Sequence, residues 1–266
     1  MTRPAQIIIH WLVKQMGITI IGIDCAVQDK NVGLALASFD GREAHIDQVA
    51  VGLKEGAVVD IVADWISHHP PALLALDAPL GWPKGLRQGL RGHKAGKPIR
   101  LEPNDMFRRE TDKEVKRRTN KQPLDVGADR IARTAHAALG LLHKLRARTG
   151  QDIPLAWKPS MIPRTCAIEV YPAATLRAHE IKAQGYKQKD ARNARQSLLG
   201  QLKGKLSLPS DPTSLKYLQS NVDALDATIC VLAGVDFLRG EVYEPPDLKL
   251  AKKEGWIWVR EPVHYT

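Results

Sequence analysis

The distribution of apolar residues predicts strands in the first part of the chain. Three runs rich in apolar and β-branched residues follow one another from Ile18, with the sequences ITIIGIDCA, VGLALASF and REAHIDQVAV. Asp40-Gly41 separates the second run from the third, and this pair tolerates the positive φ angles of a tight hairpin turn. A short polar turn, VQDKN, joins the first two runs. The pattern therefore predicts three consecutive strands in an antiparallel meander.

A helix and a buried strand follow the meander. Within residues 57–68, apolar side chains recur at helical spacing, and two prolines, at 70 and 71, end the pattern. The continuous apolar run ALLALDAP is typical of a strand buried in a parallel sheet. The order strand, strand, strand, helix, strand predicts an α/β fold. Its mixed sheet would combine a three-strand antiparallel meander with parallel strands, flanked by helices.

Helical patterns dominate the second half of the chain. Residues 128–148 form an amphipathic pattern, and the stretch 82–163 is predicted to be a largely helical, basic insertion within a single domain of residues 1–266. The core resumes at RTCAIEV. A basic helical region at 180–204, a long helix at 221–238 and a last strand, GWIWV, complete the prediction.

Three of the predicted core strands end in a carboxylate: Asp24, Asp77 and Glu169. The last long helix adds Asp223 and Asp226, which are three residues apart and therefore share one helix face. That face continues with small residues, which permit close packing against a sheet: Ala227, Cys230, Ala233 and Gly234. We expect the five carboxylates to gather where the strands end.

Such a gathering calls for a cation. Neighbouring carboxylates repel one another and raise one another's pKa. Mg²⁺ or Mn²⁺ is the natural counter-charge, because hard divalent ions take oxygen ligands. Two ions about 4 Å apart activate a water and stabilise the leaving oxygen of a phosphodiester.

The hypothesis gives each of these carboxylates a catalytic, metal-binding role. Asp24 would bridge the metal ions, with Asp77 and Asp226 as further ligands. Asp223 and Glu169 would complete the shell or orient water.

Each carboxylate also has a simpler interpretation. Asp24 and Asp77 could hydrogen-bond their own backbone in a turn after a strand. Asp223 could stabilise the positive end of the helix dipole, and Glu169 could pair with a buried Arg or Lys.

Charge points to a polyanionic partner. The formal net charge is +10, and the pI is about 9.6. Residues 84–121 contain 13 Lys or Arg against 5 Asp or Glu, a surplus of eight positive charges directly after Asp77. A solvated face is the simpler interpretation, but this position favours contact with the phosphates of nucleic acid. The candidate contacts are Arg108, Arg109, Lys116, Arg117 and Arg118.

Cysteine usage and hydropathy indicate the compartment. The three cysteines are widely spaced in apolar runs, as expected of small buried side chains in a reducing compartment. No apolar run approaches the roughly 20 residues needed to cross a bilayer. We therefore expect a cytoplasmic protein with no membrane partner, whose first dozen or so residues form a short helix or tail on the body.

Six motifs resemble the DUF429 family of predicted nucleases, which have a ribonuclease H-like fold: GIDCA, LDAPLGWP, FRRETD, EVYPAAT, DALDA and EGWIWV. The order of the acids resembles the ribonuclease H-like superfamily, closest in layout to its Holliday-junction-resolvase branch. The resemblance implies the same five carboxylates as the acidic site, and a further shared motif containing Arg109 and Asp112. The ribonuclease H branch proper takes a ligand from the first helix. Here that helix offers only Asp60 and Asp64, on the predicted solvent face, so neither is included.

The leading hypothesis is a metal-dependent nuclease that hydrolyses phosphodiester bonds of nucleic acid. One alternative is a protein of the same fold that binds nucleic acid without turnover, which predicts affinity that falls steeply with salt. Another is a nucleotide hydrolase or phosphotransferase of the actin-like branch. Against the latter, the segment CAVQDKNVG lacks a Gly/Thr-rich turn to cradle phosphates.

Overall fold

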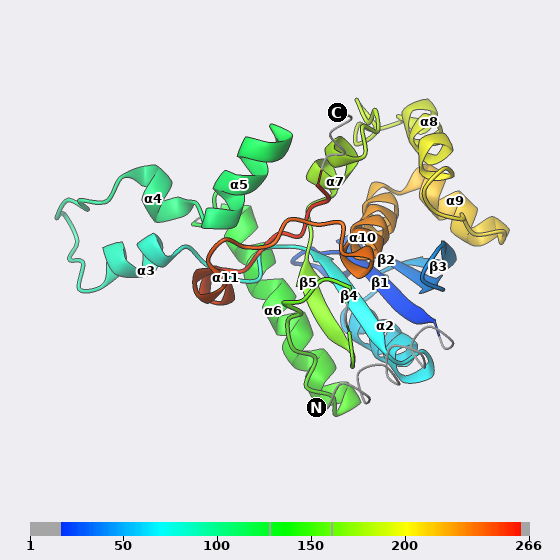
Figure 1. Cartoon of the computed structure of the whole chain (residues 1–266), viewed down its shortest axis with the longest axis horizontal. Helices are drawn as coiled ribbons and strands as arrows, with labels where there is room; N and C mark the ends of the chain where they lie inside the picture. The colour runs from blue at the N-terminus through cyan, green and yellow to red at the C-terminus, as the bar shows by residue number, and fades with distance from the viewer. Residues whose placement is uncertain (1–16, 128, 161, 262–266) are drawn as a thin grey trace.

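The computed structural model describes residues 17–127, 129–160 and 162–261 (Figure 1). The predicted N-terminal helix or tail lies outside the described residues. A five-stranded sheet forms the centre, in the order β3-β2-β1-β4-β5. β1, β2 and β3 are antiparallel neighbours, whereas β4 and β5 run parallel to β1. The predicted mixed sheet is therefore confirmed, and it is consistent with a ribonuclease H-like arrangement. The strands are β1 (Ile18–Asp24), β2 (Gly33–Phe39), β3 (Ala44–Val51), β4 (Ala72–Asp77) and β5 (Cys166–Glu169).

Helices cover both faces of the sheet. α10 (Val222–Arg239) packs on one face, where it contacts β1, β2 and β4. α2 (Ala57–His68) and α6 (Asp129–Thr149) contact each other, and their apolar side chains join the opposite face of β1 and β4 in one hydrophobic cluster. The central strands are apolar on both sides because both of their faces are buried.

Two glycines bring α10 unusually close to the sheet. A Cβ atom at Gly22 of β1 would lie 2.0 Å from the carbonyl oxygen of Ala227, and one at Gly33 of β2 would lie 1.9 Å from that of Asp223. Backbone therefore packs directly on backbone at the start of the helix. This contact fixes the first turns of α10 beside the ends of the strands.

The segment between β4 and β5 contains four helices: α3 (Lys84–Leu90), α4 (Pro103–Phe107), α5 (Glu110–Thr119) and α6. α3 and α4, with the loop between them, form an arm that projects from the body at the left of Figure 1. We call residues 84–107 the basic arm. α6 does not project with the arm, because it packs with α2 in the helical layer on the sheet.

The remaining helices lie between β5 and the end of the described chain. They are α7 (Pro172–Ala178), α8 (Arg192–Leu202), α9 (Pro212–Ser220) and α11 (Leu248–Glu254); a short 3-10 helix, η1 (Asp29–Asn31), follows β1. None of the helices in the described ranges combines the length and the hydropathy that a membrane span requires.

The predicted last strand, GWIWV, forms no regular strand. Its segment makes an isolated parallel bridge between Ile257 and Glu169 and an antiparallel one between Arg260 and Val242. Both tryptophans of this segment are buried, and the Trp258 ring meets that of Phe237 edge-on at 4.9 Å. Both tryptophans therefore belong to the core.

Candidate acidic site at the strand ends

Asp24 and Asp77 end adjacent parallel strands and are paired in register. Side chains alternate between the two faces of a strand. Ile20 of β1 and Ala75 of β4 belong to the hydrophobic cluster that contains α10, and the two aspartates follow at even spacing. Both carboxylates therefore lie on the α10 side of the sheet.

α10 brings Asp223 and Asp226 to the same place. The helix begins after Asn221, whose side chain accepts a hydrogen bond from the backbone N–H of Ala224 at 2.8 Å. The close contact at Gly33 holds this first turn against β2. Asp226 is 2% exposed, so its carboxylate faces the protein rather than solvent.

The pKa values of Asp24, Asp77 and Asp223 are all raised by neighbouring carboxylates of this group. Burial raises the pKa of Asp24 well above its ordinary value, and the charges of Asp77, Asp226 and Asp223 raise it further. Burial, followed by the charge of Asp226, raises the pKa of Asp77 to about 7. The pKa of Asp223 is raised by burial and by Asp226. The structure therefore places Asp24, Asp77, Asp223 and Asp226 near one another at the strand ends.

The loop between α7 and α8 supplies a cation that the sequence did not reveal. The ammonium nitrogen of Lys187 lies 2.5 Å from Oδ2 of Asp226, and the Tyr186 hydroxyl donates to Oδ1 at 2.6 Å. Burial lowers the pKa of Lys187, but the charge of Asp226 and its neighbours raises it by more, so the ammonium form is favoured. These residues lie in the predicted helical region 180–204, but the helix α8 begins only at Arg192, and nothing in the spacing of Tyr186 and Lys187 links them to the acids.

The four aspartates offer carboxylate oxygens, which are the ligands that hard divalent cations prefer. The atoms are not arranged as a finished metal site: in the described parts of the chain, no group of three or more His, Cys, Asp or Glu side chains is placed to hold a metal ion. The cluster of Asp24, Asp77, Asp223 and Asp226 is instead partly compensated by the Lys187 ammonium. We call these four carboxylates the acidic cluster.

Glu169 is bound by a buried arginine rather than joined to the acidic cluster, although its charge also raises the pKa of Asp77, and the structure does not support the ligand role predicted for it. It pairs in register with Leu76, one residue before Asp77, so alternation turns its side chain toward the opposite face. Both of its oxygens accept hydrogen bonds from Arg109, at 2.7 and 2.9 Å, and Oε2 also accepts one from the Leu80 N–H at 2.9 Å. The simpler interpretation, a carboxylate paired with a buried arginine, describes this residue.

Arg109 is 1% exposed, so the predicted contact with nucleic acid is wrong. Its guanidinium also binds Asp112, with N–O distances of 2.8 and 3.1 Å. Burial lowers the pKa of Arg109, but the charges of Glu169 and Asp112 raise it by more and keep the guanidinium charged. Arg109 of the motif FRRETD is thus the buried partner of Glu169 in the motif EVYPAAT.

A third motif, EGWIWV, closes the same network. The Glu254 carboxylate accepts hydrogen bonds from the backbone N–H groups of Lys84, at 2.5 Å, and Glu110, at 3.0 Å. Gly255 has a φ angle of 86°, and a Cβ there would lie 2.7 Å from Oε2 of Glu169. Glycine is therefore required by both backbone conformation and space. These contacts tie α5, α11 and the end of β5 together.

The other predicted phosphate contacts are occupied by local partners. Arg108 pairs with Asp125 at 2.9 Å, and Lys116 donates to the Asn120 side chain at 2.6 Å. Arg117 and Arg118 both pair with Glu114. In the basic arm, by contrast, the described structure contains no ion pair to any of Arg87, Arg91, Lys94, Lys97 and Arg100.

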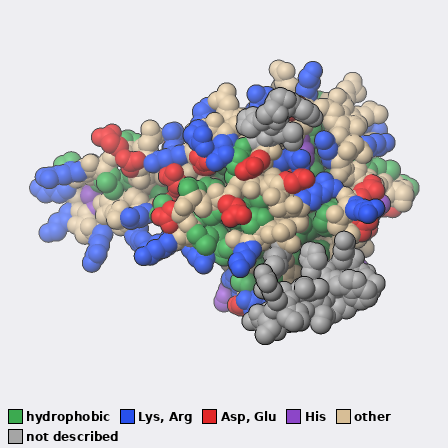
Figure 2. All heavy atoms as spheres, in the orientation of Figure 1, with side chains coloured by type: hydrophobic (Ala, Val, Ile, Leu, Met, Phe, Trp, Pro, Cys, Tyr) green, Lys and Arg blue, Asp and Glu red, His purple; other side chains and the backbone are tan. Residues whose placement is uncertain are grey.

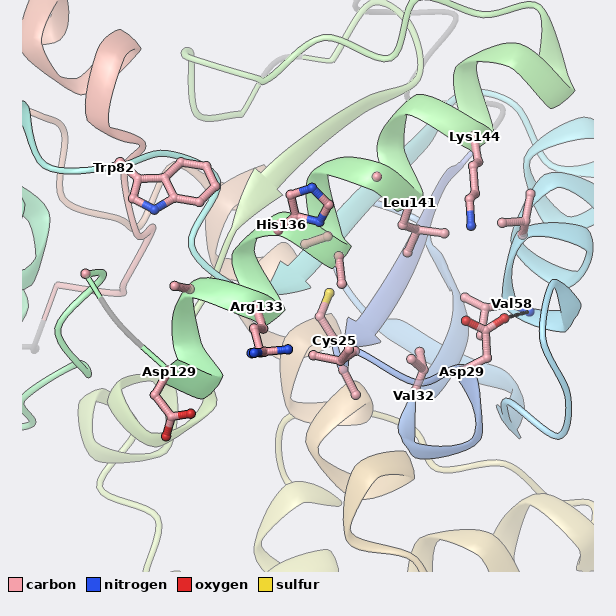
Figure 3. Close-up of a pocket in the computed structure, with 18 residues that line it drawn as sticks. Cys25, Asp29, Val32, Val58, Trp82, Asp129, Arg133, His136, Leu141 and Lys144 are labelled. Carbon is pink, nitrogen blue, oxygen red and sulfur yellow. Dashed lines mark hydrogen bonds between the residues drawn. The ribbon is translucent and has the colours of Figure 1, made fainter. Parts of the chain in front are cut away.

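A groove of about 820 Å³ lies on the other side of the end of β1, between α6, α2 and the loop after the strand (Figure 3). Arg133, His136 and Lys144 line it from α6. Asp29 and Asp129 line it as well, so the formal charges of arginine, lysine and aspartate cancel. The groove adjoins the site but has no charge preference for a polyanion.

The fold and site define an α/β protein whose acidic cluster gathers at the carboxyl ends of two central parallel strands. The family model DUF429, described as a protein of unknown function, matches residues 22–249, and the chain belongs to this family. The match begins within β1 and ends within α11, so it includes the acidic cluster and the buried residues Arg109, Asp112 and Glu169. No curated protein matches the chain.

Proposed function

We propose that this protein is a metal-dependent nuclease that hydrolyses phosphodiester bonds. The observation that carries the proposal is the convergence of four carboxylates from β1, β4 and α10 at one end of the sheet. Buried like charges raise one another's pKa and destabilise the fold unless a cation compensates them. A protein that keeps such a cluster has a use for it.

Asp24, Asp77 and Asp226 are the residues that would hold Mg²⁺ or Mn²⁺, with Asp223 beside them. Asp24 is the centre of the group, because the charges of the other three all act on it. When bound, the ion supplies a nucleophilic water and charge stabilisation at the leaving oxygen. The chain's own task is to orient these oxygens on rigid elements, which the paired strand ends and the capped helix accomplish.

In this proposal, the Lys187 ammonium balances the charge of Asp226 when no metal ion is bound. Its ammonium occupies one oxygen of Asp226, and its side chain is 56% exposed, so it can leave toward solvent without disturbing the core. A divalent cation and the ammonium therefore compete for the same carboxylate. Once released, Lys187 is free to attract a substrate phosphate.

The proposed substrate is nucleic acid and the proposed compartment is the cytoplasm. The surplus of positive charge supports the first, and the three scattered cysteines support the second.

The test is cleavage of DNA and RNA substrates, single-stranded and duplex, with Mg²⁺ or Mn²⁺. Asp24→Asn should abolish metal-dependent cleavage, because it removes the central carboxylate. Asp64→Asn is the matched control, since Asp64 is an exposed acid of α2 away from the cluster. Cleavage that persists in Asp24→Asn, or in excess chelator, would reject this site.

A second candidate is a nucleic-acid-binding protein without turnover. The Lys187–Asp226 ion pair favours it, because this pair neutralises one carboxylate of the acidic cluster in the absence of metal. This candidate predicts binding that weakens steeply with salt and no cleavage of any substrate with either ion.

A further inference from the structure

The basic arm carries a concentrated group of cations that make no ion pair within the described residues. Between Arg87 and Arg100 the sequence contains five Lys or Arg and no Asp or Glu. Every residue from Arg91 to Arg100 is exposed, and Arg87 is exposed as well. Figure 2 shows Lys and Arg side chains gathered on this projection, at the left of the molecule.

The arm has internal packing that holds these charges in place. Gly85 lies against the backbone of Asp105, where a Cβ would come within 1.9 Å of the carbonyl oxygen. A Cβ at Gly89 would contact Leu101 and Ile99 at 3.2 and 3.4 Å. α3 therefore packs on the loop segment that precedes α4. Arg87 therefore lies on a packed helix, and the single loop between the two packed helices carries Arg91, Lys94, Lys97 and Arg100.

The arm also begins at the carboxyl end of β4. The chain runs from Asp77 into α3 within seven residues, and the buried Glu254 carboxylate anchors the N–H of Lys84. The arm consequently leaves the body from the end of the sheet that carries the acidic cluster.

We infer that the basic arm binds the phosphate backbone of duplex nucleic acid. A duplex presents one negative charge per about 1.7 Å of its axis, which suits a row of cations without acids. Single-strand binders add aromatic side chains on which bases stack. Residues 84–106 contain no Phe, Tyr or Trp, and the ring of Phe107, the last residue of the arm, lies against Gly127, so the projecting part of the arm offers charge and no stacking platform. This inference rests on the proposed function for its substrate class, and on the arm alone for its site.

The experiment measures binding to a fluorescent duplex and to its separate strands, in chelator, as a function of salt. The arm variant combines Arg91→Gln, Lys94→Gln and Lys97→Gln. The control variant combines Lys249→Gln, Lys252→Gln and Lys253→Gln, which removes the same charge from exposed lysines near α11. Melting temperature and circular dichroism check both variants for folding.

We expect the wild type to bind the duplex more tightly than either strand. The slope of log affinity against log salt should fall in magnitude by about 0.9 for each phosphate that the protein no longer neutralises, hence by roughly 2 to 3 in the arm variant. The slope of the control variant should stay within about half a unit of the wild type. As a second measurement on unaltered protein, the duplex should protect Lys94 and Lys97 from acetylation and leave Lys249 and Lys252 reactive.

Three results would overturn the inference. They are equal slopes in the arm and control variants together with unprotected arm lysines, a preference for single strands, or binding to anionic lipid vesicles but not to duplex. Because no turnover is needed, these results are independent of catalysis. Duplex binding through the arm without cleavage under any metal would reject the nuclease proposal alone.

Discussion

At the residue scale, Arg109 balances two carboxylates in the interior. Its guanidinium bonds Glu169 and Asp112, and all three side chains are no more than 2% exposed. Removing one partner of a buried ion pair leaves uncompensated charge, which costs about 3–5 kcal/mol. Arg109→Met should lower the free energy of unfolding by this amount in urea titrations.

Two control variants show whether the loss of stability comes from the buried ion pairs. Arg109→Lys keeps the charge but cannot bond both carboxylates in a planar fork, so its loss should be intermediate. Arg117→Gln removes an exposed arginine paired with Glu114 and should change stability little. A stability of Arg109→Met equal to the wild type would show that the network does not stabilise the fold.

Lys187 gives a second prediction at this scale, which depends on the proposed metal site. Lys187→Met removes the ammonium that competes for Asp226. A hydrogen bond between charged groups contributes about 1.5–3 kcal/mol, so Mn²⁺ affinity should rise by roughly ten- to a hundredfold in calorimetric titrations. Lys189→Met, an exposed neighbour, is the control. Unchanged Mn²⁺ affinity in Lys187→Met would contradict the competition.

The sequence predicts the positions of some residues of the site and not of others. Asp24 and Asp77 follow apolar runs directly, and their strands are adjacent, so position along the chain was enough. Glu169 needed the register of β5, because a shift of one residue turns a side chain to the other face. Lys187 lies in an irregular loop, and only the folded chain brings it to Asp226.

At the element scale, the close contact between α10 and the sheet determines where the acids lie. Gly33→Ala would place a methyl group 1.9 Å from the Asp223 carbonyl oxygen, so backbone must move. Overpacking of this kind costs about 1–3 kcal/mol, and the same variant should lose metal-dependent cleavage if the proposed function holds. Chemical denaturation and the cleavage assay measure the two effects.

Gly200→Ala is the matched change elsewhere. Gly200 lies inside α8, and its added Cβ would meet nothing within 4 Å. Alanine is a better helix former than glycine, so this variant should gain up to about 1 kcal/mol. Equal effects of the two substitutions would show that the helix does not depend on the Gly33 contact.

Elements with a strong internal pattern were predictable from sequence. The predicted helix at 57–68 has the bounds of α2, and α6 and α10 begin and end within one residue of the predicted ranges. The segment GWIWV has the composition of a strand, but its neighbour β5 has four residues and pairs with it through one bridge. Strand formation depends on such a partner, which local composition does not specify.

At the scale of the whole molecule, the acidic cluster should make stability depend on pH. The folded-state pKa of Asp77, about 7, lies above the value of about 3.9 expected in the unfolded chain. A group with a raised folded-state pKa contributes stability that is full below the unfolded pKa and is lost as pH rises through the folded one. Without metal, the contribution of Asp77 to stability should therefore decline between about pH 4 and pH 7 and then level off.

Asp77→Asn tests this dependence. The substitution removes the titrating group, so the variant should gain stability relative to the wild type as pH rises from 4 to 8. Unfolding titrations at several pH values, in chelator, measure the difference, and Asp64→Asn should follow the wild type. A difference between Asp77→Asn and the wild type that does not change with pH would show that the buried carboxylate does not titrate in this range.

Charge could be counted from sequence but not located. The surplus in residues 84–121 is evident, and nearby acids bind the arginines that follow α4, whereas no acid among the described residues pairs with Arg87, Arg91, Lys94, Lys97 or Arg100. Which positive charges stay available depends on folded neighbours. Residue counts alone do not contain that information.

The position of α10 has a consequence for how the chain is made. A ribosome synthesises β1, β2, β3 and β4 well before residues 222–239, yet those residues cover one apolar face of these strands. The nascent sheet must leave that face bare until most of the chain has emerged, and exposed apolar surface of this kind is what chaperones bind. The sheet can therefore reach its native packing only after residues 222–239 have left the ribosome.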